Sequence, residues 1–343
     1  MSTTLPQAPV FRRLTRIRLS WLVVVLAAVA VLCALSVAVG SRVVDWSEII
    51  AGLGGATDTI GQAAVVKRVP RTILAALAGA ALALSGAVMQ GVTRNPLADP
   101  GILGINMGAS LAVVVGIAWF GISAAHVYIW TAIFGAGAAA VFVYAVGALG
   151  RGGPTPLKLA LAGAATSVAL LSFIRAIVLP RADISEGVQS WQIGGVGGAS
   201  YASIGTVLPF LVVGFAICLL SARRLNALAL GDELAAGLGE RVAIARASAA
   251  LGSVVLCGAI TAVCGPIGFV GLIVPHLCRL LVGVDHRWLL PFSALMGAGL
   301  LIGSDVVGRV IARPNELDVG IVTAFIGAPF FIWIVRRTKV GDL

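Results

Sequence analysis

The sequence predicts an all-α membrane protein with about ten transmembrane helices, each needing about 20 apolar residues. Of its 343 residues, 59% are hydrophobic and only 11% are charged, whereas a soluble domain carries roughly 25% charged residues. Its 43 glycines are typical of membrane helices that pack closely through small residues. An outer-membrane barrel would instead show alternating segments of roughly ten residues. We therefore expect residues 1–343 to form a single transmembrane domain.

The first predicted membrane helix covers residues 19–39 and follows a basic cytoplasmic tail at residues 1–18. Its apolar run is longer than the roughly 7–15 residues of a signal-peptide core. Residues 41–68 are more polar and are expected to form the first outer loop. The remaining predicted spans cover residues 72–91, 101–120, 126–148, 158–179, 204–220, 242–263, 266–282, 288–308 and 319–335.

Proline and glycine interrupt the predicted spans in two places. Asn95-Pro96 and Asp99-Pro100 separate the second span from the third, and residues 265–271, rich in glycine, separate the seventh from the eighth. Residues 180–203 are too polar and glycine-rich to cross the membrane. We expect them to form a surface or re-entrant segment, because irregular backbone is tolerated at membrane depth only under a cover of protein or water.

The basic residues predict that both chain termini face the cytoplasm. With the N-terminus inside, 16 of the 24 Lys and Arg residues fall on the inner side, as the positive-inside rule requires. This orientation needs an even number of spans. The remaining eight fall on the outer side or near it and need another explanation: Arg42, Lys67, Arg68, Arg71, Arg175, Arg181, Arg309 and Arg313.

The segment 222–246 is the one dense cluster of charge between two apolar spans. Charge of this density cannot lie in hydrocarbon, so the segment is expected at the cytoplasmic face. Asp232 is a suitable N-cap after the break at Gly231, and Gly239 is a suitable helix stop, which predicts a short helix at 232–238. This helix could lie on lipid headgroups or dock into a soluble partner below the membrane. Its candidate contact residues are Gly231, Asp232, Glu233, Leu234, Ala235, Leu238 and Gly239.

No catalytic or metal-binding pattern is visible. The chain lacks the phosphate-binding pattern GxxxxGK[ST], and His126, His276 and His286 share no ligand spacing. The five cysteines lie in apolar spans and are expected to be small buried hydrophobic residues. The net charge of +10 is scattered over span ends, so it does not indicate nucleic-acid binding.

Several polar residues lie within the apolar spans or near their breaks. Asp305 and Arg309 have the spacing of an i,i+4 ion pair, which argues against Asp305 as a proton relay. Arg175, near the end of the fifth span, either reaches toward the headgroups or faces a transport pathway and attracts an anionic substrate. Gln90 and Asn106 either line that pathway or tie helices together by hydrogen bonds.

Seven sequence blocks, in this order and spacing, resemble the permease subunits of bacterial ABC importers for ferric siderophores, haem and vitamin B12, the FecCD-type family. The similarity runs from about residue 65 to 337, and the TRNPLADPGILG block is most similar to the ferric-siderophore branch. The blocks are RVPR at 68–71, SGAVMQ at 85–90, TRNPLADPGILG at 93–104, LALGDELAAGLG at 228–239, GPIGFVGLIVPH at 265–276, DHR at 285–287 and GIVTAFIGAPF at 320–330.

The resemblance implies a permease of a bacterial inner-membrane importer with three kinds of protein partner. A second permease subunit, either identical or related, would complete the pathway. The helix at 232–238 would insert into a dimer of cytoplasmic ATP-binding subunits, which hold ATP and magnesium, so this chain would bind no cofactor and would not be an enzyme. Arg68, Arg71 and Arg309 would grip acidic residues of an extracytoplasmic substrate-binding protein.

Three alternatives stay open at this point. The substrate could be haem or cobalamin instead of a ferric siderophore. The chain could be an ion-coupled secondary carrier that works alone, or a membrane scaffold that transports nothing.

Overall fold

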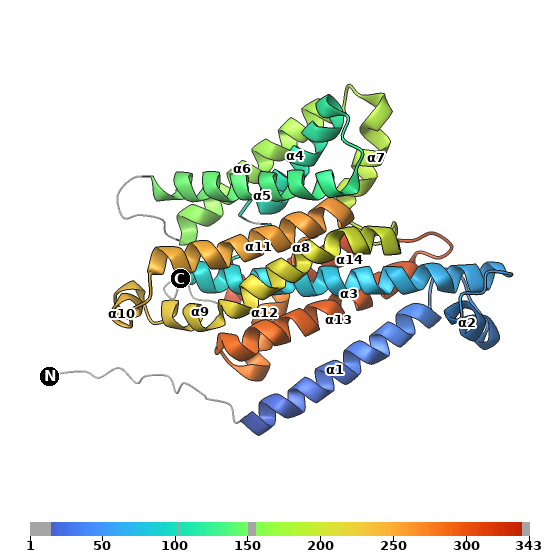
Figure 1. Cartoon of the computed structure of the whole chain (residues 1–343), viewed down its shortest axis with the longest axis horizontal. Coiled ribbons are helices and arrows are strands. Elements are labelled where there is room, and N and C mark those ends of the chain that lie inside the picture. Colours follow the sequence, from blue (N-terminus) through green and yellow to red (C-terminus); the bar gives the residue numbers. More distant parts are fainter. Residues whose placement is uncertain (1–14, 102, 150–155, 338–343) are drawn as a thin grey trace.

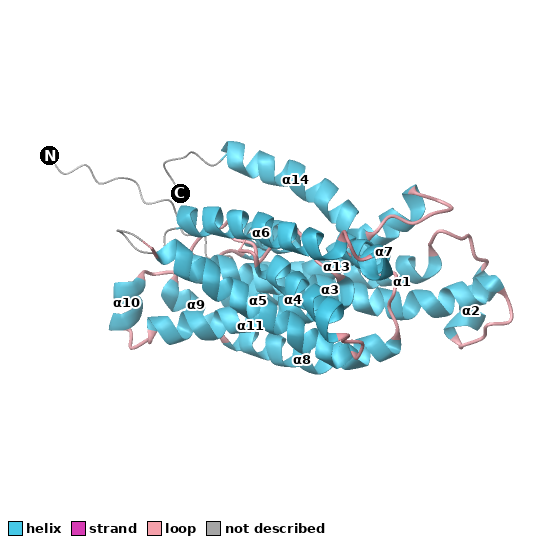
Figure 2. Ribbon diagram, turned by 90° about the horizontal axis from the view of Figure 1, so that it is seen from above, coloured by secondary structure: helices cyan, strands magenta, loops and turns pink. Residues whose placement is uncertain are grey.

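The computed structural model describes residues 15–101, 103–149 and 156–337, and all regular secondary structure in these ranges is helical (Figures 1 and 2). Its helices are α1 (Thr15–Ala38), α2 (Trp46–Leu53), α3 (Ile60–Thr93), α4 (Ile105–Phe120), α5 (Ala125–Ala148), α6 (Pro156–Val178), α7 (Ala182–Ile193), α8 (Tyr201–Leu220), α9 (Ala222–Leu228), α10 (Asp232–Gly237), α11 (Val242–Cys264), α12 (Val270–Val282), α13 (His286–Ile311) and α14 (Val319–Arg337).

The predicted spans reappear in order as the longer helices of the fold. Among the described helices, α1, α3, α5, α6, α8, α11 and α13 are long and apolar enough to cross a membrane. The spans predicted at 101–120, 266–282 and 319–335 correspond to the shorter apolar helices α4, α12 and α14. The all-helical membrane class is therefore confirmed.

The prediction of a loop at 41–68 was wrong, because this segment holds α2 and the first turns of α3. Helix α3 begins at Ile60 and has 34 residues. Its start is set by Thr59, whose side chain accepts a hydrogen bond from the Gln62 backbone N–H, while the Gln62 side chain returns to the Thr59 backbone. This capping box satisfies N–H groups that the helix leaves unpaired. The polar residues that argued for a loop lie within the extended first part of α3.

The eighth predicted span starts later than expected, because α12 begins at Val270 instead of residue 266, after the glycine-rich break. Gly265 adopts φ +70°, and a methyl group there would lie 1.9 Å from the Trp191 carbonyl oxygen. Only glycine can combine this backbone angle with so close a contact. The break lies against the end of α7, which occupies part of the segment expected at 180–203 to be surface or re-entrant.

Helix α3 forms the centre of the bundle and packs against α13, α11 and α12 (Figure 1). Most residues in the apolar stretch of α3 are buried, whereas most of those in α1 are exposed. Two glycine contacts allow this packing. A methyl group on Gly79 would lie 2.1 Å from the Gly297 carbonyl oxygen of α13, and one on Gly86 would lie 2.1 Å from the Gly271 carbonyl oxygen of α12. The backbones can approach this closely only where no side chain intervenes.

The two ends of the bundle carry different elements. Figures 1 and 2 place α9 and α10 at one end, here called the α10 end, and α2 and α7 toward the other, here called the α2 end. The first turn of α1 and the last turn of α14 both lie toward the α10 end. The segment 222–246 and both described ends of the chain therefore lie toward the same side of the bundle.

We predict that Gly79→Ala destabilises the fold by about 1–3 kcal/mol, because the added methyl group must push α3 away from α13. The midpoint of thermal unfolding in detergent measures the effect. Gly205→Ala is the matched control, since Gly205 also lies in a helix, α8, and its added methyl group would meet no atom within 4 Å. Equal unfolding midpoints for the two variants would contradict the close-packing argument.

Candidate functional site

The segment 222–246 forms two short helices whose inner side is anchored in the protein. Leu225 and Leu228 of α9 and Ala235 of α10 are fully buried. Leu234 and Leu238 point the other way and are 62% and 69% exposed. Two exposed leucines on one small, charged loop form an apolar contact surface, because water solvates them poorly.

The short helix predicted at 232–238 exists, but its N-cap was assigned wrongly. Helix α10 covers Asp232–Gly237, and its N-cap is Gly231 at φ 113°, which offers no side-chain acceptor. Asp232 is the first helical residue, and its carboxylate is used for ion pairs instead. Gly239 adopts φ +85° just beyond the helix, so the predicted glycine stop is confirmed.

Arginines from three helices fix this loop. Arg94, at the end of α3, donates from Nε to the Leu228 carbonyl oxygen at 2.6 Å and forms an ion pair with Asp232. Arg246 of α11 also pairs with Asp232, at 2.9 Å. Arg224 of α9 pairs with Glu240 at 3.2 Å. Such partly exposed pairs are individually worth only about 0–1 kcal/mol, so they orient the loop more than they stabilise the fold.

A further contact joins the loop to the start of α13. Asn226 donates from Nδ2 to the Asp285 carboxylate at 2.7 Å, and its Oδ1 accepts the His286 backbone N–H at 2.9 Å. Burial tends to raise the pKa of Asp285, but the bonds from Asn226 and from the Arg287 backbone N–H hold that pKa below its usual range. Asp285 is therefore a charged N-cap that connects α9 to α13.

At the α2 end, three arginines meet the C-terminal end of α1. Arg68 of α3 donates to the carbonyl oxygens of Val37, Ala38 and Arg42 at 3.1, 2.9 and 2.7 Å. The carbonyl oxygens of Ser36 and Val39 accept from Arg309 of α13, and that of Gly40 accepts from Arg313. The last carbonyl groups of a helix lack intrahelical donors and carry partial negative charge. The arginines thus fasten the exposed helix α1 to α3 and α13.

A buried carboxylate balances part of this positive charge. Asp305 has no exposed surface and lies between Arg71, at 2.8 Å, and Arg309, at 3.0 Å. The predicted i,i+4 pair of Asp305 and Arg309 is therefore confirmed. Arg71 also pairs with Glu316, which accepts a hydrogen bond from Ser41. Burial alone would raise the pKa of Glu316, but the bonds from Arg71 and Ser41 keep it below its usual range.

Arg68, Arg71 and Arg309 do not have the exposed surface position that direct docking to a binding protein would require. Arg68 is 6% exposed and Arg309 is 1% exposed, and the guanidinium groups of all three are bonded within the chain. The physical reason is that α3 begins twelve residues earlier than the predicted residue 72, which places Arg68 and Arg71 inside a packed helix. Glu316, at the edge of this cluster, is exposed.

The polar residues near the breaks lie in the protein interior. Gln90 donates to the Gly271 carbonyl oxygen at 3.2 Å, and Asn106 donates to the Ile267 carbonyl oxygen at 3.3 Å. These bonds tie α3 to the first turn of α12 and α4 to the break that precedes α12. Their side-chain oxygens find no hydrogen-bond partner within the described ranges. Arg175 differs, because it is exposed on α6 and its guanidinium contacts no acceptor in the described chain.

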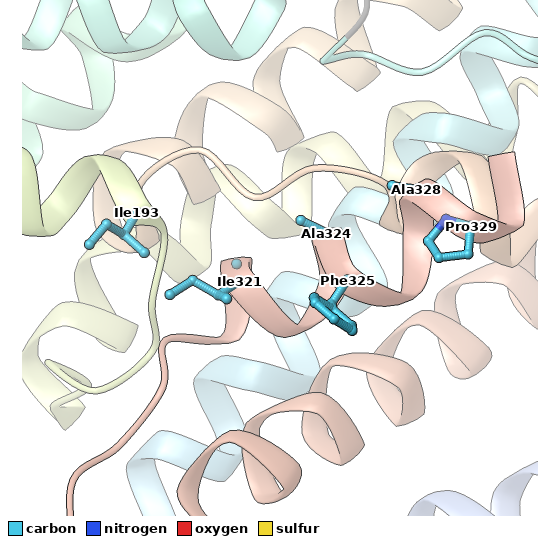
Figure 3. A pocket seen from close by; sticks show the side chains of 7 residues that line it. Ile193, Ile321, Ala324, Phe325, Ala328 and Pro329 are labelled. Carbon is cyan, nitrogen blue, oxygen red and sulfur yellow. The ribbon is translucent and has the colours of Figure 1, made fainter. Parts of the chain in front are cut away.

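An open cavity of about 570 Å³ lies between the end of α7 and one face of α14 (Figure 3). No charged side chain lines it, so it offers a hydrophobic surface without a polar group for recognition. Its lining residues are Ile193, Gly320, Ile321, Ala324, Phe325, Ala328 and Pro329.

The described residues contain no cluster of His, Cys, Asp or Glu suited to a metal ion. Cys218, Cys257, Cys264 and Cys278 are buried and Cys33 is partly buried, as predicted for small hydrophobic residues. His276 packs edge-on against Phe330 of α14.

The contacts of Arg94, Asn226 and Arg246 were missed by sequence reasoning. Arg94 precedes the Asn95-Pro96 break, and a basic residue at a helix stop is the one signal that could have indicated a role there. No sequence signal marks Leu228 as its acceptor, because the two residues are 134 positions apart.

Comparison with known proteins gives consistent results across sequence and structure. The sequence model of the FecCD transport family matches residues 25–337. The chain is 43% identical to the ferric enterobactin transport system permease protein FepD of Escherichia coli K12, with 90% of this chain and 92% of that protein covered. It is 43% identical to the iron(3+)-hydroxamate import system permease protein FhuB of Bacillus subtilis 168, with 80% and 71% covered.

A solved structure of a metal-chelate type ABC transporter in an inward-facing conformation has the same fold. It superposes with a TM-score of 0.78 at 27% identity and covers 94% of this chain and 99% of that chain. A hemin transport system permease protein, HmuU of Yersinia pestis, is 40% identical, with 79% of this chain and 82% of that protein covered.

We predict that Asp305→Ala lowers the free energy of unfolding by about 3–5 kcal/mol, because it leaves two arginines without their buried counter-charge. Glu316→Gln is the matched control and should cost less than about 1 kcal/mol, since Glu316 is partly exposed. Chemical denaturation in detergent, followed by tryptophan fluorescence, compares the two. A loss for Asp305→Ala no larger than that for Glu316→Gln would contradict the proposed charge balance.

Proposed function

Because this chain belongs to the FecCD transport family, we propose that it is the membrane permease subunit of an ATP-driven importer that moves a ferric siderophore across a bacterial inner membrane into the cytoplasm. The observation that supports this most strongly is the loop of α9 and α10. This charged loop presents two exposed leucines at one end of an apolar bundle. The names of FepD and FhuB, which refer to ferric enterobactin and iron(3+)-hydroxamates, favour a ferric siderophore.

We propose that the seven long helices and the three shorter apolar helices all cross the membrane and that the α10 end faces the cytoplasm. The excess of basic residues predicted for that side supports this orientation. The first turn of α1, the loop of α9 and α10 and the last turn of α14 all lie toward this end, which fits an even number of crossings. The three shorter helices α4, α12 and α14 would then cross with the help of the irregular segments that adjoin them.

Within this proposal, α10 is the element that receives force from ATP hydrolysis. Leu234 and Leu238 would enter a cleft on a cytoplasmic ATP-binding subunit, which would hold ATP and magnesium. A second permease subunit, identical or related, would supply a second helix that corresponds to α10. The chain itself offers no phosphate-binding pattern, so hydrolysis belongs to the partner and this chain is not an enzyme.

The α2 end would receive an extracytoplasmic substrate-binding protein. Three arginines were expected to dock this protein. Among them, Arg71 is the one whose ion-pair partner, Glu316, is exposed at the surface. Arg68 and Arg309 would act indirectly by holding α1 in place. Docking through such charges should weaken as ionic strength rises, because salt screens exposed charges.

A haem importer is the second candidate, because the hemin permease HmuU is nearly as similar to this chain as FepD. Purification from the native membrane in mild detergent tests the proposal and separates the candidates. We expect a cytoplasmic ATPase and a binding protein to co-purify, with a ferric siderophore as the bound ligand. Bound haem would support the second candidate. Transport by the purified chain alone, driven by an ion gradient without an ATPase, would refute the importer assignment.

We predict that Leu238→Asp lowers uptake by about tenfold or more, because burying an unpaired carboxylate in the partner's cleft costs more than about 1.4 kcal/mol. Uptake and ATP hydrolysis are measured together in liposomes that contain the complete transporter. Leu149→Asp is the control, since Leu149 is 70% exposed between α5 and α6 and lies outside the loop. Normal uptake with Leu238→Asp would argue against α10 as the contact.

We further propose that Arg175 faces the pathway and attracts an anionic substrate, because its guanidinium is exposed and contacts no acceptor in the described chain. Arg175→Ala is expected to raise the substrate concentration for half-maximal uptake severalfold, as loss of one exposed charge contact of about 1 kcal/mol would. Arg175→Lys keeps the charge and should preserve most of the affinity. Unchanged kinetics in Arg175→Ala would leave Arg175 only a role at the headgroups.

A further inference from the structure

Arg94 occupies an unusual position at the end of the central helix. It is the C-cap of α3 and adopts φ 52°, in the left-handed region, with its N–H bonded to the Gln90 carbonyl oxygen. Residues with a Cβ adopt this conformation uncommonly, and glycine is usual at such helix ends. An arginine here indicates that its side chain is needed.

The Arg94 side chain binds both sides of the turn between α9 and α10. Nε donates to the Leu228 carbonyl oxygen, the last residue of α9, and Nη2 donates to the carboxylate of Asp232, the first residue of α10. Arg246 binds the same carboxylate, but it lies on α11, which continues directly from the loop. Arg94 therefore connects α10 to a part of the bundle that is remote in the chain.

Directly beyond Arg94 lies the break between α3 and α4. Two side chains fold the break back on itself: Asn95 accepts the Leu97 N–H at 2.9 Å, and Asp99 accepts the Gly101 N–H at 2.7 Å. The Asp99 carboxylate also lies against Gly271, since a methyl group there would be 2.7 Å from Asp99 Oδ2. The break after α3 is thus in contact with the first turn of α12.

Hydrogen bonds on either side of the two breaks reinforce this contact. Gln90, one turn before Arg94, binds the Gly271 carbonyl oxygen, and Asn106, in the first turn of α4, binds the Ile267 carbonyl oxygen. A continuous series of contacts therefore runs from α10 through Arg94 to the two irregular segments in the interior. Irregular segments are where a helical bundle can change its shape with least loss of packing.

We propose that Arg94 is a positioning residue that transmits movement of α10 to α3 and to the paired breaks 95–101 and 265–271. This inference rests on the proposed function, in which α10 is pushed by an ATP-binding subunit. Without Arg94, α10 would still dock and ATP would still be hydrolysed, but less of the movement would reach α3. The expected defect is therefore in the number of ATP molecules consumed per substrate imported.

The test measures that number in liposomes that contain the complete transporter with its ATPase and its loaded binding protein. The variants are Arg94→Gly, which keeps the left-handed backbone accessible, Asp232→Ala, and both changes together. Each single variant is expected to raise ATP consumed per substrate about two- to fivefold, the ratio that corresponds to a partly exposed ion pair. The double variant is expected to show a smaller effect than the product of the two single effects, because the two changes share the ion pair between Arg94 and Asp232.

Arg181→Ala is the matched control. Arg181 also pairs with an aspartate, Asp183, and also donates to a carbonyl oxygen, that of Ala118, but it is the N-cap of α7, which lies toward the α2 end. Its removal should leave the ratio unchanged. The amount of ATPase that co-purifies with each variant, and the thermal unfolding midpoint, report on assembly and folding.

Three outcomes would overturn the proposal. The first is a wild-type ratio for Arg94→Gly, and the second is a double variant whose effect is the product of the two single effects. The third is a loss of co-purified ATPase in Arg94→Gly that accounts for the whole defect, since Arg94 would then only support docking. If the wild-type transporter itself shows no ATP-driven uptake, the proposed function fails, and this inference fails with it.

Discussion

The close approach of the α3 backbone to α13 and α12 is the constraint on which the rest of this structure depends. Gly79 meets Gly297, and Gly86 meets Gly271, at distances that leave no room for a side chain. Both contacts lie well inside a helix of 34 residues, roughly 51 Å long. The centre of α3 is thereby fixed, and each of its ends projects to one end of the bundle. Arg68 and Arg71 lie toward one end, and Arg94 lies at the other.

At the α2 end, the arginines and the C-terminal carbonyl groups of α1 satisfy each other's hydrogen-bonding needs. An isolated guanidinium is costly in a membrane protein interior, and the final carbonyl groups of α1 would otherwise lack donors. The structure pairs the two: Arg68, Arg309 and Arg313 cover the end of α1, and Asp305 supplies a buried counter-charge. Positive charge at the α2 end is therefore used to hold a weakly packed helix.

The loop of α9 and α10 shows a different balance of forces. Its buried residues Leu225, Leu228 and Ala235 attach it to the bundle, while its ion pairs are exposed and individually weak. A loop held in this way can transmit a push without being locked in place, because exposed ion pairs break and reform at little cost. The buried ion pairs around Asp305 at the opposite end lack this freedom.

Local sequence was sufficient to predict the membrane class, the order of the long helices, the breaks near residues 95–100 and 265–271, and the glycine stop at Gly239. Each depends on local composition: an apolar run of sufficient length, or a residue whose backbone preference ends a helix. Only the packing of the helices decided the use of Asp232 as an ion-pair partner and the burial of Arg68 and Arg309. These features join residues such as Arg71 and Asp305, which are 234 positions apart. The partner of a charged side chain depends on which helices pack together, and local sequence does not contain that information.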